Sequence, residues 1–260
     1  MMTRLIWIVL AVLLMSAVQA AEHFWDEIPR SPSTTVPSEV LDGYWNGQFQ
    51  RVNREVAGAQ NARLVFFGDS ITWYWSLGDA TGREVWEDQF APYNPINMGN
   101  SGDITPVMLY RITRGNLDFP DGQHPRVAVL LCGINNFGVT QSAGGREKWD
   151  LGMDCPPEDV AHAQRAIAQV FRRRLPHTRL IMMALLPVAD PAKWERCRRV
   201  NAINAGLACD PNEVAFVDLQ DRFLLPDGTI NRALYADGIH LSTLGYREWA
   251  KGIAPLIEEF

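Results

Sequence analysis

Short apolar runs alternate with longer helical patterns along most of the chain, and this alternation constrains the fold more than any other feature. Runs such as "VAVLL" and "LIMMALL" are apolar at every position, as strands buried on both faces of a sheet are. Strands are therefore expected at Leu64–Gly68, Ile96–Met98, Val127–Leu131, Leu180–Leu185 and Val214–Leu219. Helical patterns lie at about Gly43–Ala57, Thr105–Arg114, Pro157–Leu175, Ala192–Ala208 and Thr243–Glu258. This order predicts a three-layer α/β/α sandwich around a central, mostly parallel five-stranded sheet.

The first twenty residues differ from the rest of the chain. A single positive charge at Arg4 precedes a short apolar run, and small residues follow it up to Ala20. This pattern is typical of a signal peptide, here cleaved before Ala21, and it predicts a secreted or periplasmic protein. A retained anchor is the alternative, although the run is short for a spanning helix. The expected organisation is a signal peptide at residues 1–20, an irregular lead-in at 21–42 and one folded domain at 43–260.

Length and charge limit the class of protein. The chain has 260 residues, a formal net charge of −6 and 47% apolar residues, which suits one large domain with a sizeable core. The acidic balance and the lack of a long basic run argue against nucleic acid as a partner. The acidic balance also argues against lasting attachment to an anionic membrane surface, and no stable membrane insertion is expected. The sequence does not indicate an oligomeric state.

Four cysteines matter because an exported protein meets an oxidising compartment. Cys155 precedes the helix after the third strand, and Cys197 lies near the start of the helix after the fourth, so both belong to one side of the sheet. Cys209 lies at the opposite end of that second helix, about 18 Å from Cys197 along its axis. A disulfide needs Cα atoms within about 7 Å, so Cys209 is too far away to replace Cys197 in a bridge to Cys155. The predicted pairing, if a bridge forms, is Cys155–Cys197, and Cys132 is expected to be a buried strand thiol. The cysteine spacing fits no zinc template, so no metal is expected.

Glycine and polar residues follow the predicted strands. Gly68-Asp69-Ser70 comes after the first strand, "GNSGDIT" after the second and "CGINNFG" after the third, and "YADGIHLSTLGY" precedes the last helix. In parallel sheets, ligands bind beyond the carboxyl ends of the strands. These loops are therefore expected to meet at one edge of the sheet and to form a site there.

The residue types in these loops are those of acyl transfer. A serine hydroxyl becomes a nucleophile when a histidine takes its proton, so Ser70 is the candidate nucleophile and His240 the candidate base. Asp237, three residues before His240, is the candidate orienting carboxylate. An oxyanion needs convergent donors, for which the candidates are the N–H groups of Ser70 and Gly102 and the side chain of Asn135.

Structural roles remain open for the same residues. Ser70 alone reads as the cap of a helix, and His240 alone as an ordinary surface or core histidine. Asp69 is expected to hold the turn by accepting backbone N–H groups, and Asp103 to cap the helix that begins at Thr105.

The four blocks "FFGDSITWYW", "NMGNSGDIT", "LLCGINNFG" and "ADGIHLSTLGY" together resemble those of the SGNH/GDSL hydrolases, in particular the platelet-activating-factor acetylhydrolase-like branch. The resemblance runs from about Trp45 to the C-terminus. It implies the flavodoxin-like fold of that family, no cofactor, Ser70, Asp237 and His240 as catalytic residues, and Ser70, Gly102 and Asn135 as the oxyanion hole. The third block departs from the usual Gly-x-Asn-Asp because Asn136 occupies the position of the aspartate.

Aromatic residues follow the candidate nucleophile. At least one of Trp73, Tyr74 and Trp75 is expected to pack in the core, and Trp73 or Trp75 to line the acyl or sugar pocket. Trp149 lies in a long loop after the third strand, and long loops are often functional.

Together these features predict an exported serine esterase that hydrolyses short-chain, acetyl-type esters of a small molecule or glycan through an acyl-enzyme. The alternatives are a carbohydrate O-acetyltransferase with the same triad, a lysophospholipase or thioesterase, and a non-catalytic glycan-binding module of the same fold. A classical α/β-hydrolase is disfavoured because the chain has no Gly-x-Ser-x-Gly elbow.

Overall fold

A computed structural model describes residues 32–35, 39, 43–138, 154–205 and 214–259 of the chain, and within them five parallel strands form one sheet. The predicted signal peptide, Trp149 and Cys209 lie outside the described residues. The sheet order is β2-β1-β3-β4-β5. The strands are β1 (Leu64–Gly68), β2 (Ile96–Gly99), β3 (Val127–Leu131), β4 (Arg179–Met183) and β5 (Val214–Val217).

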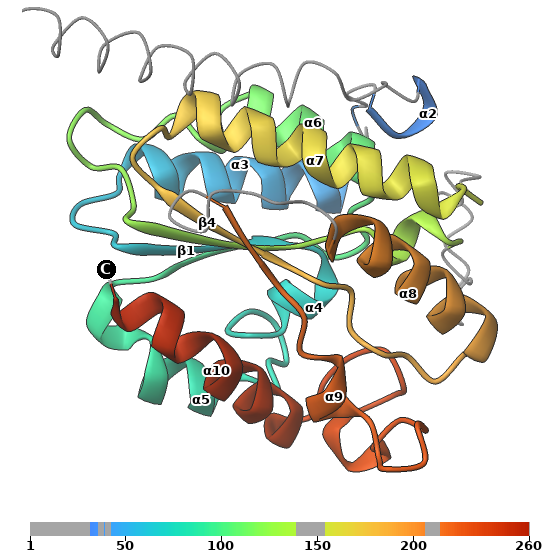
Figure 1. Ribbon diagram of the computed structural model, residues 1–260. Coiled ribbons are helices and arrows are strands. Elements are labelled where there is room, and N and C mark those ends of the chain that lie inside the picture. The colour runs from blue at the N-terminus through green and yellow to red at the C-terminus, as the bar shows by residue number, and fades with distance from the viewer. Residues whose placement is uncertain (1–31, 36–38, 40–42, 139–153, 206–213, 260) are drawn as a thin grey trace, which may run out of the picture.

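Helices cover both faces of the sheet, which confirms the three-layer prediction (Figure 1). One face carries α3 (Gly43–Ala57), α6 (Thr105–Thr113) and α7 (Pro157–Arg174), and the other carries α5 (Arg83–Gln89) and α10 (Thr243–Glu258). Beside α7 lies α8 (Pro191–Ala205). The remaining segments are single turns: α2 (Pro32–Thr35), α4 (Ser70–Trp73), α9 (Gln220–Phe223), η1 (Ala91–Tyr93), η2 (Ile134–Asn136) and η3 (Arg232–Leu234).

Strands β1 and β3 carry no polar side chain because both of their faces are buried. In β1, Leu64 and Phe66 pack with α5 and α10, whereas Val65 and Phe67 pack with α3, α6 and α7. All four side chains are fully buried. Successive side chains of a strand point to opposite faces, so a continuous apolar run fills two cores at once.

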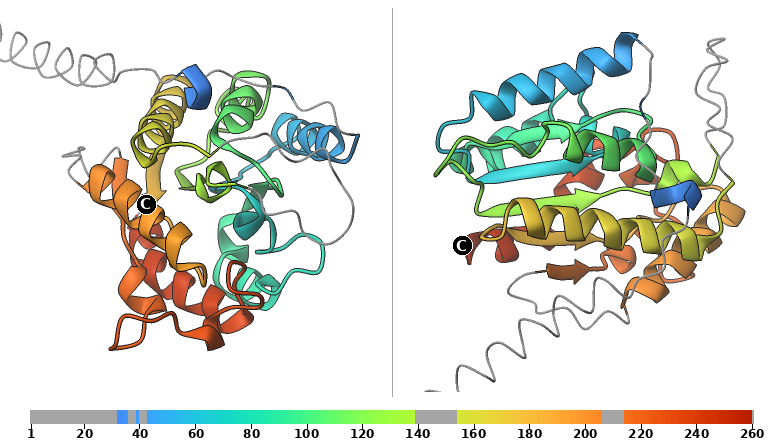
Figure 2. Two further views of the ribbon diagram at one scale, coloured as in Figure 1. Left: turned by 90° about the vertical axis from the view of Figure 1, so that its right-hand side faces the viewer. Right: turned by 90° about the horizontal axis from the view of Figure 1, so that it is seen from above.

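The strands end in register at one edge of the sheet. Gly68 of β1 pairs with Gly99 of β2 on one side and with Leu131 of β3 on the other. The loops that follow these three strands therefore emerge side by side. The left view of Figure 2 looks onto this edge, which is the right-hand side of Figure 1.

Two strands end earlier than the apolar runs suggest. β4 stops at Met183, and Leu185 instead exchanges hydrogen bonds with the side chain of Asn201 in α8: its N–H donates to Asn201 Oδ1 over 2.8 Å, and its carbonyl accepts from Nδ2 over 2.9 Å. β5 stops at Val217, because Asp218 turns the chain by accepting the N–H of Gln220. The length of an apolar run therefore does not predict the residue at which strand pairing ends.

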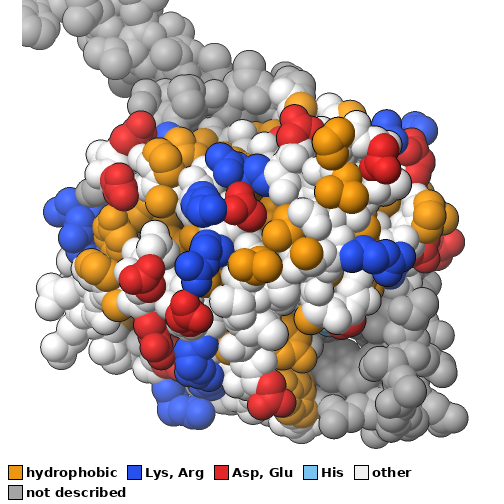
Figure 3. Space-filling view, turned by 90° about the horizontal axis from the view of Figure 1, so that it is seen from below, with side chains coloured by type: hydrophobic (Ala, Val, Ile, Leu, Met, Phe, Trp, Pro, Cys, Tyr) orange, Lys and Arg blue, Asp and Glu red, His pale blue; other side chains and the backbone are white. Residues whose placement is uncertain are grey.

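The outer surface of α10 and α5 carries charges of both signs. Figure 3 shows acidic and basic side chains interspersed on this face. Arg247 of α10 pairs with Glu84 of α5, and Glu248 lies between Arg222 and Lys251. Among the described residues, no helix is both long and apolar enough to cross a membrane.

The expected cysteine bridge is absent from the structure. Cys155 and Cys197 are both free, buried thiols, and so is Cys132 at the end of β3. The sulfur of Cys155 lies 3.8 Å from the side-chain amide nitrogen of Asn136. Cys197 lies on the buried face of α8 and packs into the hydrophobic core. Sharing one side of the sheet was therefore not enough to pair the two residues.

Candidate active site

Ser70 lies at the turn from β1 into α4, and its backbone is held there by tight packing. Asp69 caps this short helix, because its Oδ1 accepts the N–H of Ile71 over 3.0 Å, as predicted for a turn-holding residue. No larger residue fits at Gly68, because a Cβ at this position would lie 2.0 Å from Thr72 Oγ1 and 2.5 Å from the Leu131 carbonyl oxygen. The Gly-Asp-Ser order thus places the serine close against the ends of two strands.

The structure brings Ser70, His240 and Asp237 into one chain of hydrogen bonds. His240 Nε2 lies 2.9 Å from Ser70 Oγ, and His240 Nδ1 lies 2.6 Å from Asp237 Oδ2. The Ser70 residue is 7% exposed, while the His240 side chain is 28% exposed and faces both partners. This geometry allows a proton to move from the serine hydroxyl to the imidazole while the carboxylate fixes the opposite ring nitrogen.

The spacing of Asp237 and His240 is explained by the turn between them. Asp237 Oδ1 accepts the backbone N–H groups of Ile239 and His240, at 3.0 and 2.8 Å. Gly238 has a φ of +90°, and a Cβ there would lie 2.7 Å from the Cβ of Ala189. One carboxylate thus shapes the loop with one oxygen and holds the imidazole with the other.

These hydrogen bonds also determine the charge of Asp237. Partial burial raises the pKa of this carboxyl, but the His240 ring and the N–H groups of His240 and Ile239 outweigh it, so the net pKa lies below its usual value. Asp237 is therefore ionised throughout the neutral range, as an orienting carboxylate must be.

The three candidate oxyanion donors belong to neighbouring loops. The loop after β2 is tied to the Ser70 turn, because the N–H of Asn100 donates to the Gly68 carbonyl over 3.0 Å. Gly102 in this loop has a φ of +84°, a conformation that favours glycine. Asn135, from η2 after β3, donates its side-chain amide to the Asp103 carbonyl over 3.0 Å. These contacts place the Gly102 and Asn135 segments together beside the Ser70 turn.

Asn136 performs the capping role that the sequence assigned to Asp103. Its Oδ1 accepts the N–H of Thr105, the first residue of α6, over 3.1 Å, and its Nδ2 donates to Thr105 Oγ1 over 2.9 Å. Asn136 is fully buried. An amide fits this position because it both accepts and donates, which an ionised aspartate cannot do.

Asp103 is instead one of two buried carboxyls beneath the site, so its predicted role as a helix cap was wrong. Burial raises the pKa of Asp103 to about 6, although the neighbouring Arg111 and the Trp45 indole N–H oppose the rise. Burial also raises the pKa of Asp69 to about 7, with the Ile71 N–H opposing the rise and the Asp103 charge adding to it. Nothing in the sequence pattern indicated that either carboxyl is removed from water.

The structure confirms that at least one of the three aromatics packs in the core, but it does not show Trp73 or Trp75 lining a pocket at the site. Trp75 is fully buried in the core, with its ring 4.5 Å from that of Tyr246, so it is a packing residue and does not line a pocket. Trp73 packs against α3, beneath the guanidinium of Arg51. The aromatic residue that contacts His240 is Tyr74, for which the sequence pattern predicted no role at the site. Its ring meets that of His240 edge to face at 5.1 Å, and it is half-buried.

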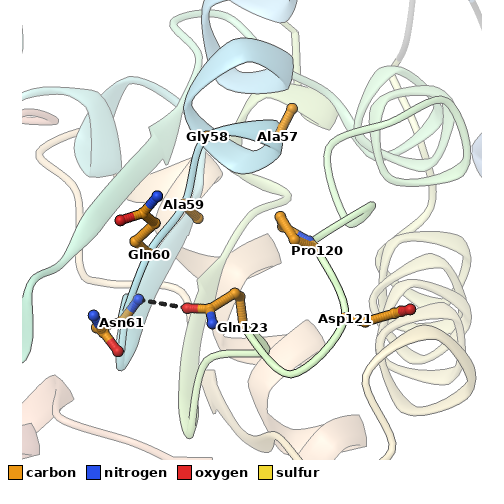
Figure 4. A pocket seen from close by; sticks show the side chains of 8 residues that line it. All are labelled: Ala57, Gly58, Ala59, Gln60, Asn61, Pro120, Asp121 and Gln123. Carbon is orange, nitrogen blue, oxygen red and sulfur yellow. Dashed lines mark hydrogen bonds between the residues drawn. The ribbon is translucent and has the colours of Figure 1, made fainter.

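The hollow shown in Figure 4 lies away from these residues. It has a volume of about 360 Å³ and is lined by the segment before β1 and the segment before β3, where the N–H of Asn61 donates to Gln123 Oε1. These segments precede the strands, so the hollow lies at the opposite edge of the sheet from Ser70. Within the described part of the chain, no group of three or more His, Cys, Asp or Glu side chains is arranged to hold a metal ion.

Comparison with known proteins identifies the family. The model of the GDSL-like Lipase/Acylhydrolase family matches residues 66–248, most of the chain, and the chain therefore belongs to this family. It is an ester-hydrolysing enzyme.

Relatives by sequence are acetylhydrolase subunits. The chain is 30% identical over 236 residues to platelet-activating factor acetylhydrolase IB subunit alpha1 of Bos taurus, covering 89% of this chain and 90% of that protein. It is 27% identical over 221 residues to subunit alpha2 of Gallus gallus, covering 83% and 84%.

Solved structures share the fold at lower identity. A GDSL-like lipase from Bacteroides thetaiotaomicron is 20% identical with a TM-score of 0.59, covering 84% of this chain and 98% of that chain. A variant of an acetyl-xylooligosaccharide esterase from Geobacillus is 17% identical with a TM-score of 0.55, covering 77% and 94%.

Proposed function

We propose that this protein is an exported serine esterase that removes short acyl groups, chiefly acetyl, from small-molecule or glycan esters. The observation that carries the proposal is the hydrogen-bond chain from Asp237 through His240 to Ser70 Oγ, at 2.6 and 2.9 Å. A serine with a histidine base and an ionised orienting carboxylate is the arrangement that activates a hydroxyl for attack on an ester carbonyl.

The proposed reaction has two steps. Ser70 Oγ attacks the ester carbonyl as His240 Nε2 takes its proton, and Asp237 stabilises the imidazolium. The N–H groups of Ser70 and Gly102 and the Asn135 side chain bind the oxyanion, after which His240 protonates the leaving alcohol. Water, deprotonated by His240, then attacks the acyl-enzyme, and Ser70 recovers its proton as the acid leaves.

The preference for acetyl groups is supported by the relatives. The mammalian protein that is 30% identical is named an acetylhydrolase, and a neighbour with the same fold is named an acetyl-xylooligosaccharide esterase. Export is supported by the first twenty residues alone, whose charge and apolar run are typical of a signal peptide. Sequencing the N-terminus of the mature protein from the periplasm or medium tests it, with Ala21 expected as the first residue.

The first test of the esterase is the hydrolysis of p-nitrophenyl acetate, butyrate, octanoate and palmitate by wild type, Ser70→Ala and Ser76→Ala. Ser76→Ala is the matched control, because it removes a serine hydroxyl six residues after Ser70 that accepts a hydrogen bond from the side-chain amide of Asn97. Activity should fall steeply with chain length, be lost in Ser70→Ala and remain in Ser76→Ala.

Other results would identify the alternatives. A preference for palmitate would move the substrate to lipids, as for a lysophospholipase or thioesterase. Acetyl transfer to a glycan acceptor with little hydrolysis would indicate an acetyltransferase. Equal inactivity of wild type and Ser70→Ala, with glycan binding unchanged and no labelling by a serine-directed phosphonate, would indicate a binding module.

A further inference from the structure

A fully buried ion pair lies beneath the loop that follows β2. The Arg111 guanidinium of α6 reaches Asp103 with Nη2 2.6 Å from Oδ2, and both side chains are 0% exposed. Asp103 Oδ1 in turn accepts the indole N–H of Trp45 over 2.7 Å. The carboxylate is thus fixed from two sides.

Arg111 also holds the strand ends that precede the site. Its Nη1 donates to the Met98 carbonyl in β2 over 3.0 Å, and its Nη2 donates to the Gly68 carbonyl in β1 over 3.4 Å. The guanidinium lies 4.5 Å from the centre of the Phe67 ring, and Asn116 Oδ1 accepts a further hydrogen bond. One side chain thereby connects the strands that lead to Ser70 and to Gly102.

Asp103 links its ion pair with Arg111 to the two oxyanion donors other than Ser70, which are Gly102 and Asn135. It directly follows Gly102, so the position of its carboxylate restricts the peptide that carries the Gly102 N–H. Its carbonyl accepts one hydrogen of the Asn135 amide over 3.0 Å. An amide nitrogen has two hydrogens, so the second remains for a substrate oxygen.

A buried ion pair of this kind contributes little to stability. The desolvation of both charges offsets their attraction, and well-packed apolar replacements are often no less stable. The contacts of Arg111 instead converge on strand ends and on one loop of the site, which indicates a role in geometry.

We propose that Arg111 and Asp103 are positioning residues that hold the Gly102 N–H and the Asn135 amide where the oxyanion forms. The inference rests on the proposed esterase function and adds to it the residues that fix the donors. Neither residue touches the substrate, so their loss should weaken binding of the transition state and leave binding of the ground state almost unchanged.

The test compares Asp103→Asn, Arg111→Met and the double variant Asp103→Asn/Arg111→Met with wild type on p-nitrophenyl acetate. A short-chain trifluoromethyl ketone, which forms an oxyanion-bearing adduct with an active serine, serves as the transition-state probe. Losing one oxyanion donor outright reduces turnover about 10²–10³-fold, so a misplaced donor should reduce kcat by about 10- to 100-fold. KM should stay within about twofold, and the inhibition constant of the ketone should rise by the factor by which kcat/KM falls.

The double variant separates positioning from folding. Each single variant leaves a buried charge unpaired and should lower Tm, whereas the double variant removes both charges and should recover much of that loss. If positioning is the role, kcat remains low in the double variant although its Tm recovers.

Thr178→Val is the matched control for the loss of a buried polar contact. Thr178 Oγ1 donates to the Pro125 carbonyl over 2.6 Å before β4, at the opposite edge of the sheet, so this variant should lower Tm and keep kcat and ketone binding. Recovery of kcat together with Tm in the double variant, or single variants no different from Thr178→Val in kcat and ketone binding, would overturn the inference. Hydrolysis that survives in Ser70→Ala would instead overturn the esterase proposal itself.

Discussion

The hydroxyl of Tyr246 donates a hydrogen bond to the backbone carbonyl of Ile71 over 2.6 Å. Tyr246 belongs to α10, directly after the loop that carries His240, and Ile71 directly follows Ser70. The bond therefore joins the element behind the proposed base to the helical turn of the proposed nucleophile. Both groups are buried, and the distance between His240 and Ser70 depends on how firmly these two elements are held.

Replacing Tyr246 by Phe should loosen this connection. The variant leaves the buried Ile71 carbonyl without its donor, which should cost about 1–3 kcal/mol of unfolding free energy. We also expect kcat on p-nitrophenyl acetate to fall about 3- to 30-fold, since a small displacement of reacting groups slows a positioned reaction. Denaturant unfolding and steady-state kinetics measure the two effects.

Thr178→Val is again a suitable comparison, because it removes another buried hydroxyl-to-carbonyl bond of 2.6 Å. It should lose a similar unfolding free energy without a change in kcat. Equal kcat values for the two variants would show that the Tyr246 bond stabilises the fold and has no part in the alignment.

Asp237→Asn should reduce kcat by about 10³–10⁴-fold, because an amide cannot stabilise the imidazolium and favours the wrong histidine tautomer. Its Oδ1 can still accept the N–H groups of Ile239 and His240, so Tm should change little. Steady-state rates on p-nitrophenyl acetate and a thermal melt measure both quantities.

Asp227→Asn is the control for this change. Asp227 also shapes an exposed turn, with its Oδ1 accepting the N–H of Thr229 over 2.9 Å, but it faces no histidine in the structure. It should keep wild-type kcat. A loss of kcat in Asp237→Asn no larger than in Asp227→Asn would refute the orienting role.

The sequence predicted those features that depend on local pattern and on topology. Apolar runs and helical periods were enough for the sheet and its layers, and the rule for parallel sheets placed Ser70, Asn135 and His240 at one edge. Helix α5 was missed because it has only seven residues and no side-chain cap, so its pattern is too short to detect.

The sequence could not show which polar residues are removed from water. Spacing alone favoured Asp103 as the cap of α6, because it lies two residues before Thr105. Only the packed structure shows that Asn136 reaches Thr105 from another loop, while Asp103 turns inward to Arg111. Likewise, three consecutive aromatics gave no indication that Tyr74, and neither tryptophan, would meet His240.

Asn136→Asp, which introduces the residue usual in the family, should destabilise this protein. Asn136 Nδ2 donates to Thr105 Oγ1 at 2.9 Å, and Thr105 Oγ1 already donates to the Thr34 carbonyl at 3.1 Å. A carboxylate would lose the donated bond at a fully buried position, for an expected cost of about 1–3 kcal/mol. Chemical denaturation at pH 8 tests this, and a variant at least as stable as wild type would contradict the capping account.

The buried Asp69 should make the stability of the protein depend on pH. Its pKa is raised from 3.8 to about 7 in the folded chain, chiefly by burial, so folding favours the protonated form. The stability that this group contributes is therefore complete below about pH 4 and is lost as pH rises through 7. Asp69→Asn cannot titrate, and its Oδ1 can still accept the Ile71 N–H.

Thermal melts of wild type and Asp69→Asn between pH 5 and pH 8.5 test this linkage. Asp103 also has a raised pKa and is present in both proteins, so the difference between their Tm values reports mainly on Asp69. The Tm of wild type should fall relative to that of Asp69→Asn as pH rises from 5 towards 7, and the difference should level off above about pH 7, where Asp69 is ionised in both the folded and the unfolded chain. Parallel Tm curves would mean that Asp69 is ionised in the folded protein throughout, and that a partner charge or water molecule offsets its burial.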